Sequence, residues 1–178
     1  MTEEESLLAA TYEDVKLHPY DPSWPAMFLA ERERLMSMFP TDFIDVQHIG
    51  STAVPELQAK PIIDILAGVA SMAVADSIVE PLCRSGYTTS AEFNATLSDS
   101  KWFMRWANGH RTHHLHVVVY GGTVWHQRLR FLDALRSDPQ VAARYSCLKI
   151  ELAAKHTNDR EAYTDAKTRF VLSVIGDA

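Results

Sequence analysis

The spacing of apolar and polar positions predicts four strands in the first two thirds of the chain. Residues 43–50, FIDVQHIG, alternate and are rich in Ile and Val, which predicts a strand. Residues 61–69, PIIDILAGV, form a nearly continuous apolar run, which is typical of a central strand covered on both faces. Residues 102–106 and 112–120 predict a pair of strands joined across the turn ANGHR.

Helical spacing surrounds these strands. A helix is predicted from the N-cap candidate Ser23 to about Met38, and another over residues 71–86 that Gly86 ends. From Thr123 the pattern is helical only, and Asp138 is suited to cap one of these helices. The order of elements predicts an α+β fold in a single domain over residues 1–178. Its sheet-containing core spans about residues 20–122, and a C-terminal helical layer spans about residues 123–178.

Composition mainly excludes classes of protein. The net charge of −6 argues against general nucleic-acid binding, because a surface that follows a nucleic-acid backbone needs a positive balance. No apolar run approaches the ~20 residues that a membrane span requires, and the acidic N-terminus lacks the features of a signal peptide. Cys83 and Cys147 lack metal-ligand spacing and are predicted to be reduced thiols, so we expect a cytoplasmic protein.

The charge is distributed unevenly along the chain. Residues 1–100 contain 5 Lys or Arg and 16 Asp or Glu, whereas residues 101–178 contain 12 and 7. A cationic half beside an acidic half suits a small polyanion with a bound cation, although most surface charges are simply solvated. We therefore expect a small phosphorylated ligand or a nucleotide as partner, while the oligomeric state is left open.

A single acid, Asp64, stands in the middle of the predicted central strand. Strand alternation places it on one face with Ile62 and Leu66, and places His114 and His116 together on one face of a later strand. A carboxylate in a central strand is costly unless it is paired or coordinated. If the two strands are neighbours, these three polar side chains form a candidate catalytic site and a candidate metal site. Alternatively, the two histidines are hydrogen-bonded on a solvated face.

The turn formed by Gly50, Ser51 and Thr52 has the composition of a phosphate cradle. Glycine lets a phosphate approach the backbone, and successive N–H groups with two hydroxyls can bind it. Lys60, before the acid-bearing strand, is placed to meet the same charge. The further cations chosen as phosphate or substrate ligands are Arg105, Arg130, Lys149 and Lys167. Other available cations, which periodicity does not orient, are Arg111, Arg128 and Arg136.

Several other polar and aromatic residues are assigned to the framework of the fold. His48 shares a strand face with apolar neighbours and is predicted to be a core histidine with a structural partner, and His113 is interpreted in the same way. The four tryptophans are predicted to pack in the interior rather than to form a base-stacking platform: Trp24, Trp102, Trp106 and Trp125.

Several segments, in their order along the chain, resemble the GrpB family. They are YDPSWPAMFLAE, HIGSTAVP, AKPIIDIL, HLHVVV, LDALRSDP, YSCLKIELA and YTDAKTRFV, and the likeness covers almost the whole chain. This family resembles a branch of the DNA polymerase β-like nucleotidyltransferases, and some of its members are fused to dephospho-CoA kinase. The resemblance implies a nucleotidyltransferase-like small mixed β-sheet flanked by helices, here with a C-terminal helical layer.

The same resemblance implies an incomplete set of acids. In the superfamily, the Gly-Ser turn is followed about ten residues later by an acid, a hydrophobic residue and a second acid. Asp64 matches the first acid, whereas Leu66 occupies the second acid position and His116 the place of the third. These enzymes hold two Mg²⁺ ions with carboxylates, which one carboxylate does not do. Glu56 stands where the family typically has the glycine of VPGL, and it is a candidate replacement acid.

The leading hypothesis is a nucleotidyltransferase-like protein that binds a nucleotide or phosphorylated metabolite and transfers a nucleotidyl or phosphoryl group. It would use a divalent metal, Mg²⁺ or Mn²⁺ with Zn²⁺ as a further option, or histidine-assisted proton transfer. The alternative is a non-catalytic nucleotide- or anion-binding sensor or accessory module with a degenerate metal site. A third hypothesis is a histidine-carboxylate site for Zn²⁺, Mn²⁺ or Ni²⁺ with hydrolytic chemistry.

Overall fold

A four-stranded mixed sheet forms the centre of the protein. The computed structural model describes residues 16–156 and 160–176. In this part of the chain the strands are β1 (Asp45–Ile49), β2 (Ile63–Val69), β3 (Ser100–Ala107) and β4 (His110–Val119), in the spatial order β1-β2-β4-β3. β2 runs parallel to β4, and the two outer pairs are antiparallel. The predicted α+β class and mixed sheet are confirmed.

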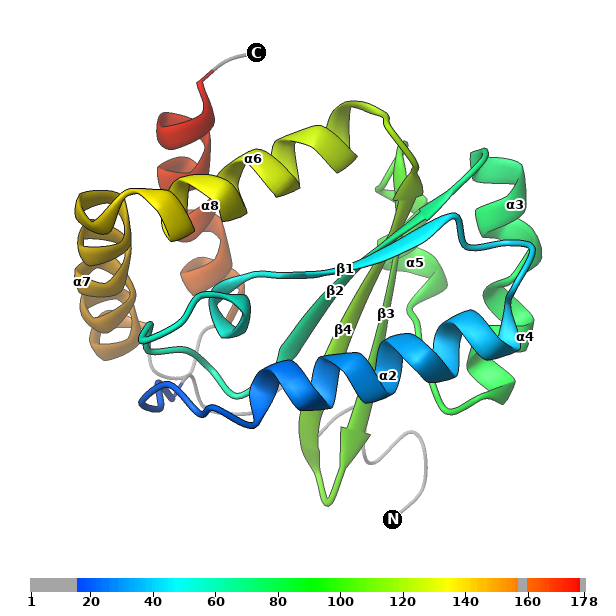
Figure 1. Ribbon diagram of the computed structural model, residues 1–178, viewed down its shortest axis with the longest axis horizontal. Helices are drawn as coiled ribbons and strands as arrows, with labels where there is room; N and C mark the ends of the chain where they lie inside the picture. Colours follow the sequence, from blue (N-terminus) through cyan, green and yellow to red (C-terminus); the bar gives the residue numbers. More distant parts are fainter. Residues whose placement is uncertain (1–15, 157–159, 177–178) are drawn as a thin grey trace.

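Helices cover both faces of this sheet (Figure 1). One face is covered by α2 (Trp24–Met38), α3 (Met72–Ser77) and α4 (Val79–Arg84). The opposite face carries a C-terminal layer of α6 (Thr123–Ser137), α7 (Pro139–Lys155) and α8 (Arg160–Ile175). Two short elements lie in the connections, the 3₁₀ helix η1 (Ser51–Ala53) and α5 (Ala91–Ala95). Among the described helices, none combines the length and the apolar character that crossing a bilayer requires.

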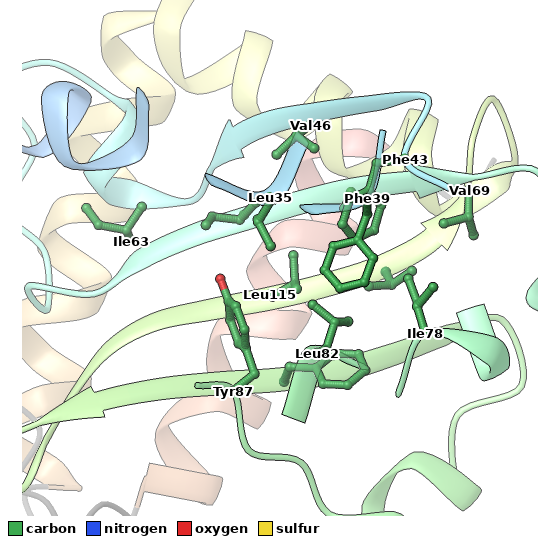
Figure 2. Close-up of a cluster of buried hydrophobic side chains, with 14 of the residues drawn as sticks. Leu35, Phe39, Phe43, Val46, Ile63, Val69, Ile78, Leu82, Tyr87 and Leu115 are labelled. Carbon is green, nitrogen blue, oxygen red and sulfur yellow. The ribbon is translucent and has the colours of Figure 1, made fainter. Parts of the chain in front are cut away.

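The first hydrophobic core lies between the sheet and the helices α2 to α4. Figure 2 shows Ile63 of β2 and Leu115 of β4 in this core, together with Leu35 of α2 and Leu82 of α4. All four side chains are fully buried, which contributes roughly 1.5–3 kcal/mol for each. Because side chains alternate along a strand, burying Ile63 in this core directs Asp64 to the opposite face.

The second hydrophobic core lies between that opposite face and the C-terminal layer. Leu66 of β2 and Val118 of β4 pack there against Trp125 and Phe131 of α6 and Tyr145 of α7. The residues around η1 join the same cluster, so the turn after β1 is held against the helices. The C-terminal layer therefore packs on the face of the sheet that carries Asp64.

Local signals predicted some elements better than others. Asp138 caps α7 as expected, because its carboxylate accepts from the backbone N–H groups of Gln140 and Val141. Ser23 directly precedes α2, but its side chain makes no capping hydrogen bond. The single helix predicted over residues 71–86 is wrong, since the segment forms two short helices. Pro81 stands in the second helix and has no N–H to bond back into the first.

Candidate functional site

The turn after β1 lies directly beside Asp64. In the antiparallel pairing of β1 and β2, Ile49 is opposite Asp64, so Gly50 follows next to the acid. Gly50 has a φ of 75°, in the left-handed region that favours glycine. A Cβ on Gly50 would also come within 2.6 Å of Oδ2 of Asp64. Glycine is thus required here both by the backbone and by the carboxylate packed against it.

The hydroxyl of Thr52 serves the fold rather than a ligand. Thr52 is buried, its Oγ1 donates to the carbonyl of Ile62, and the same oxygen lies 3.0 Å from Nε2 of His48. The interpretation of His48 as a core histidine with a structural partner is confirmed, and burial lowers the pKa of His48 to about 4. The expectation that both hydroxyls of the turn face a phosphate is therefore wrong for Thr52.

The backbone of the turn is hydrogen-bonded to α6 but retains two donors. The N–H of Ala53 donates to Gly50, and both Nε and Nη2 of Arg136 donate to the carbonyl of Ala53, which ties the turn to α6. Within residues 16–156 and 160–176, the N–H groups of Ser51 and Thr52 donate to no other protein group. Adjacent unsatisfied N–H groups in a tight turn are the donors that an anion-binding nest uses.

Asp64 and the two predicted histidines converge on one face of the sheet. β2 and β4 are neighbours, with Asp64 opposite His114 and Leu66 opposite His116. Oδ1 of Asp64 lies 3.5 Å from Nδ1 of His114 and 3.9 Å from Nε2 of His116. The three side chains are between 15% and 30% exposed, so they remain accessible to a small ligand. The structure thus brings together the three residues that the sequence placed in the site.

The protonation states of these groups follow from burial and contact. Burial alone would raise the pKa of Asp64, but the imidazoles of His114 and His116 outweigh it and hold this pKa well below its usual range. Burial lowers the pKa of His114 to about 4 against the pull of Asp64, and burial also lowers the pKa of His116. Near neutral pH the site therefore contains one carboxylate and two neutral imidazoles.

A second charged group contacts His114 from the other side. Nη1 of Arg111 lies 3.3 Å from Nε2 of His114, and because a guanidinium only donates, this nitrogen of His114 accepts. Asp64 and Arg111 thus hold His114 at both ring nitrogens. Arg111 is one of the cations whose side chain periodicity does not orient, so its place in the site could not be predicted.

The residues present do not fit the two Mg²⁺ ions of standard nucleotidyl transfer. Leu66 occupies the second acid position and is fully buried in the second core, and His116 occupies the third. In the described parts of the chain, no group of three or more His, Cys, Asp or Glu side chains is placed to hold a metal ion. Mg²⁺ prefers oxygen ligands, and the site supplies them from only one residue.

Two lysines of the C-terminal layer act on the same site. Lys149 of α7 is 1% exposed, its Nζ donates to the carbonyl of Gln58, and it lies 5.2 Å from the ring centroid of Tyr145. Burial and, to a lesser extent, the charge of Lys167 lower the pKa of Lys149 to about 7, and Asp64 opposes both effects. Lys149 therefore interacts electrostatically with Asp64, and Lys167 with Lys149. Lys60 lies half-buried in the loop that leads into β2.

Two other predicted substrate ligands lie elsewhere. Nη1 of Arg105 donates to Oε2 of Glu31 at 2.6 Å. Arg105 pairs with His113, and both residues lie on the face of the sheet opposite to Asp64. Arg130 is exposed on α6, two residues from Arg128, and residues two apart do not share a helix face. The placement of Arg105 in the phosphate site is therefore wrong. It is Arg128 whose charge reaches His116 and lowers its pKa.

Glu56 occupies a position whose backbone favours glycine. Its φ is 69°, and it is exposed in the loop between η1 and β2. Within the described residues, no hydrogen bond or ion pair joins Glu56 to another group. The left-handed conformation explains why the resemblance leads one to expect glycine here, and a role as replacement acid stays a prediction.

Comparisons with known proteins agree with this architecture. A family model described as "GrpB protein" matches residues 14–176. The chain is 33% identical over 175 residues to the glutamate-rich protein GrpB of Alkalihalophilus pseudofirmus, covering 96% of this chain and 99% of that protein. It is 34% identical over 157 residues to the protein YqkA of Bacillus subtilis, covering 88% of this chain but only 45% of YqkA. A dephospho-CoA kinase of Mycolicibacterium paratuberculosis is 31% identical over 175 residues, covering 86% of this chain and 43% of the kinase.

Solved structures extend the comparison to the fold. The conserved protein GrpB from Enterococcus faecalis superposes with a TM-score of 0.78 at 32% identity, covering 90% of this chain and 97% of that one. A structure of the Cid1 poly(U) polymerase with Mg and 3'-dATP bound superposes with a TM-score of 0.50 at 12% identity, covering 92% and 53%. This second likeness concerns the fold alone, and it places the chain among proteins with a nucleotidyltransferase-like fold. Within that class, the chain belongs to the GrpB family.

Proposed function

We propose that this protein binds a nucleotide or phosphorylated metabolite at the turn formed by Gly50, Ser51 and Thr52, and transfers a nucleotidyl or phosphoryl group from it. The observation that carries the proposal is the packing of Asp64 against Gly50, beside two backbone N–H groups that no described protein group accepts from. An ionised carboxylate therefore lies next to two N–H groups that can donate hydrogen bonds to an anion. Such a pairing suits a reaction in which a phosphate and a nucleophile are brought together.

Positive charge on the helical side balances the phosphates. Lys149 interacts electrostatically with both Asp64 and Lys167, and Lys60 lies at the same end of β2 as Asp64. A phosphate beside an ionised carboxylate is repelled unless cations compensate, and lysines act as point charges for this purpose. We therefore propose Lys60, Lys149 and Lys167 as ligands of the phosphates, as the sequence predicts.

Asp64, His114 and His116 supply the groups for proton transfer. His114 and His116 are neutral near pH 7, and Asp64 lies within 4 Å of both. His116 has a ring nitrogen that can accept a proton, whereas Nε2 of His114 accepts one only after Arg111 has moved from it. A carboxylate beside an imidazole orients the ring and stabilises the imidazolium that forms. We assign these three residues the catalytic role, in which they take the proton of an acceptor hydroxyl. The hydroxyl oxygen then bonds to the phosphorus of the donor as the P–O bond to the leaving group, pyrophosphate or the remainder of the donor, breaks.

A divalent metal at Asp64, His114 and His116 stays a prediction. The protein groups do not form a complete ligand set, so an ion would have to take oxygen ligands from the substrate phosphates, as Mg²⁺ commonly does. Two neutral imidazoles and one carboxylate also suit Mn²⁺ or Zn²⁺. Binding measured with each metal and with a chelator decides whether a metal is needed and which one.

A second candidate function is a binding module without turnover. The observation that favours it is Leu66, since a buried leucine at the second acid position removes a metal ligand without disturbing the turn. Such a protein would keep the phosphate cradle and use it to sense or present a nucleotide. The two candidates differ in what they require of Asp64.

The test is a thermal-shift screen of wild type and Asp64→Asn. Nucleoside triphosphates, sugar phosphates and dephospho-CoA are each combined with Mg²⁺, Mn²⁺, Zn²⁺ or EDTA, the coenzyme precursor being included because a relative is named dephospho-CoA kinase. A ligand at one hundred times its Kd adds about 2.7 kcal/mol, which raises Tm by several degrees. Each ligand that shifts Tm is then incubated with the protein, and products are followed by phosphorus NMR.

The matched control is Asp133→Asn, which removes an exposed carboxylate of α6. Transfer supported by wild type and Asp133→Asn but lost in Asp64→Asn supports the enzyme. A shift that Asp64→Asn retains, with no product from wild type, supports the binding module. If no phosphorylated ligand in the panel shifts Tm, the phosphate-cradle proposal is wrong.

A further inference from the structure

A bulge in the β3–β4 hairpin reorients Arg111. The strands pair regularly from Ser100 opposite Val118 to Arg105 opposite His113, but Trp106 is then opposite Arg111. β4 thus has one residue more than β3 at this point, and the alternation of its side chains shifts by one position. As a result Arg111 contacts His114, although regular alternation would place these two residues on opposite faces.

The reoriented guanidinium lies over an aromatic cluster. Cζ of Arg111 is 5.8 Å from the ring centroid of Trp102, which is half-buried on β3. The ring of Trp102 lies 5.7 Å from that of His114 and 5.6 Å from that of Phe93 in α5, both in edge-on geometry. Phe93 is 47% exposed, so one side of this aromatic cluster faces solvent. The cluster therefore joins an exposed aromatic surface, a cation and one of the proposed catalytic residues.

The position of this cluster in the sheet separates it from the phosphate turn. Across the strand order, η1 follows the edge strand β1, Asp64 and His114 lie on the two central strands, and Trp102 lies on the other edge strand, β3. The proposed catalytic residues are thus flanked by the turn on one side and by the aromatic cluster on the other. In phosphoryl transfer the attacking and leaving oxygens lie roughly in line across the phosphorus, so the acceptor and the leaving group occupy separate places.

We propose that Phe93, Trp102 and Arg111 form the subsite for the acceptor, and that this acceptor carries both a planar ring and a negative charge. The subsite rests on the proposed function, since it assigns the second substrate of the same reaction. Aromatic side chains beside a guanidinium bind a nucleobase by stacking, and the guanidinium pairs with its phosphate. A mononucleotide meets both requirements, and its bound anion would lie next to His114.

The experiment is calorimetric titration of the whole chain with adenosine monophosphate, adenosine and ribose 5-phosphate. The monophosphate should bind at least tenfold more tightly than either fragment, because each fragment offers only the ring or only the anion. Arg111→Met should weaken binding of the monophosphate by about tenfold through loss of a charge-assisted contact. Trp102→Leu should weaken it by roughly tenfold through loss of stacking, and Trp102→Phe should restore part of that loss.

Two control variants separate binding at this subsite from binding at the turn and from a general effect of charge. Arg130→Met removes an exposed cation from the outer side of α6 and should leave the affinity unchanged. Lys60→Met, on the side of the turn, should weaken only the binding of a ligand whose phosphate is held at the turn. If Lys60→Met weakens binding and Arg111→Met does not, the nucleotide occupies the turn, and the acceptor subsite fails while the proposed function stands. Equal binding of the three ligands, or none at millimolar concentration, also overturns the subsite.

Discussion

The carboxylate of Asp64 and the backbone of Gly50 are in direct contact, with no room between them for a side chain. A Cβ added to Gly50 would approach Oδ2, Cβ and Cγ of Asp64 to between 2.6 and 3.2 Å. This contact fixes the position of the acid relative to the turn, and it makes the glycine a sensitive probe of the site.

Replacing Gly50 by alanine should destabilise the protein and abolish ligand binding. Strain at a φ of 75° and overlap with Asp64 add up to about 2–4 kcal/mol, measured by urea denaturation. Gly121→Ala is the matched control, since Gly121 has a φ of 74° but nothing within 4 Å of the added carbon, and it should cost about 1 kcal/mol. Equal costs for the two variants would show that the Asp64 contact is not tight.

Replacing Glu56 by glycine should stabilise the protein. Relief of the left-handed strain at a φ of 69° exceeds the added entropy of the unfolded chain by about 0.5–1 kcal/mol, which raises Tm by a few degrees. Asn108→Gly is the comparison, because asparagine tolerates a φ of 55° better and should gain less. If Glu56 acts as a replacement acid, ligand-dependent Tm shifts will decrease in Glu56→Gly although the protein alone is more stable.

Lys149 makes stability depend on pH in a direction that can be calculated. Burial lowers the pKa of Lys149 from the ordinary 10.5 to about 7, so the unfolded chain holds this proton more tightly than the folded chain. The resulting penalty is complete below pH 7 and disappears as pH rises from 7 toward 10.5. Lys149→Met should therefore be more stable than wild type by on the order of 2 kcal/mol at pH 6.

That gain should shrink toward zero by pH 10, which urea denaturation at the two pH values measures. The exposed lysine of the same helix provides the control, because Lys155→Met should show little difference at either pH. A constant difference between Lys149→Met and wild type across this range would mean that the buried ammonium is not the cause.

Arg105 should contribute to the stability of the fold, and Arg128 should contribute to ligand binding. Glu31 is 4% exposed and also accepts from Tyr87 and Arg34, so Arg105→Met removes one partner of a buried carboxylate and should cost about 1–3 kcal/mol. It should leave ligand-induced Tm shifts unchanged. Arg128→Met should have little effect on the stability of the free protein but should decrease those shifts. The reverse outcome would return Arg105 to the site.

Much of the fold could be predicted because its signals are local. The apolar run around Asp64 identified the central strand, and alternation in β4 correctly placed His114 and His116 on one face. Asp138 marked the start of α7 because a capping carboxylate acts within a few residues. The break near Pro81 was missed because apolar spacing continues across it, whereas the missing N–H interrupts the helix.

The residues of the candidate site could be predicted only in part, because some of their contacts are with residues distant in the sequence. Asp64 stood out because an acid in an apolar strand is costly, but Thr52 was misassigned because nothing local shows that its hydroxyl bonds to Ile62. Arg105 was misassigned because its partner, Glu31, is distant in sequence. Arg111 was not chosen because a bulge shifts its side chain, and the position of a bulge is set by strand pairing rather than by residue type.

The contacts of His114 determine which of its ring nitrogens carries the proton. Because Arg111 donates to Nε2, the proton of the neutral ring must be on Nδ1, facing Asp64. The single lone pair of the neutral ring, on Nε2, is therefore occupied by Arg111, whose guanidinium also lies over the ring of Trp102. A bound anion that draws Arg111 away from Nε2 would free His114 to accept a proton there, and Asp64 at Nδ1 would stabilise the imidazolium that forms.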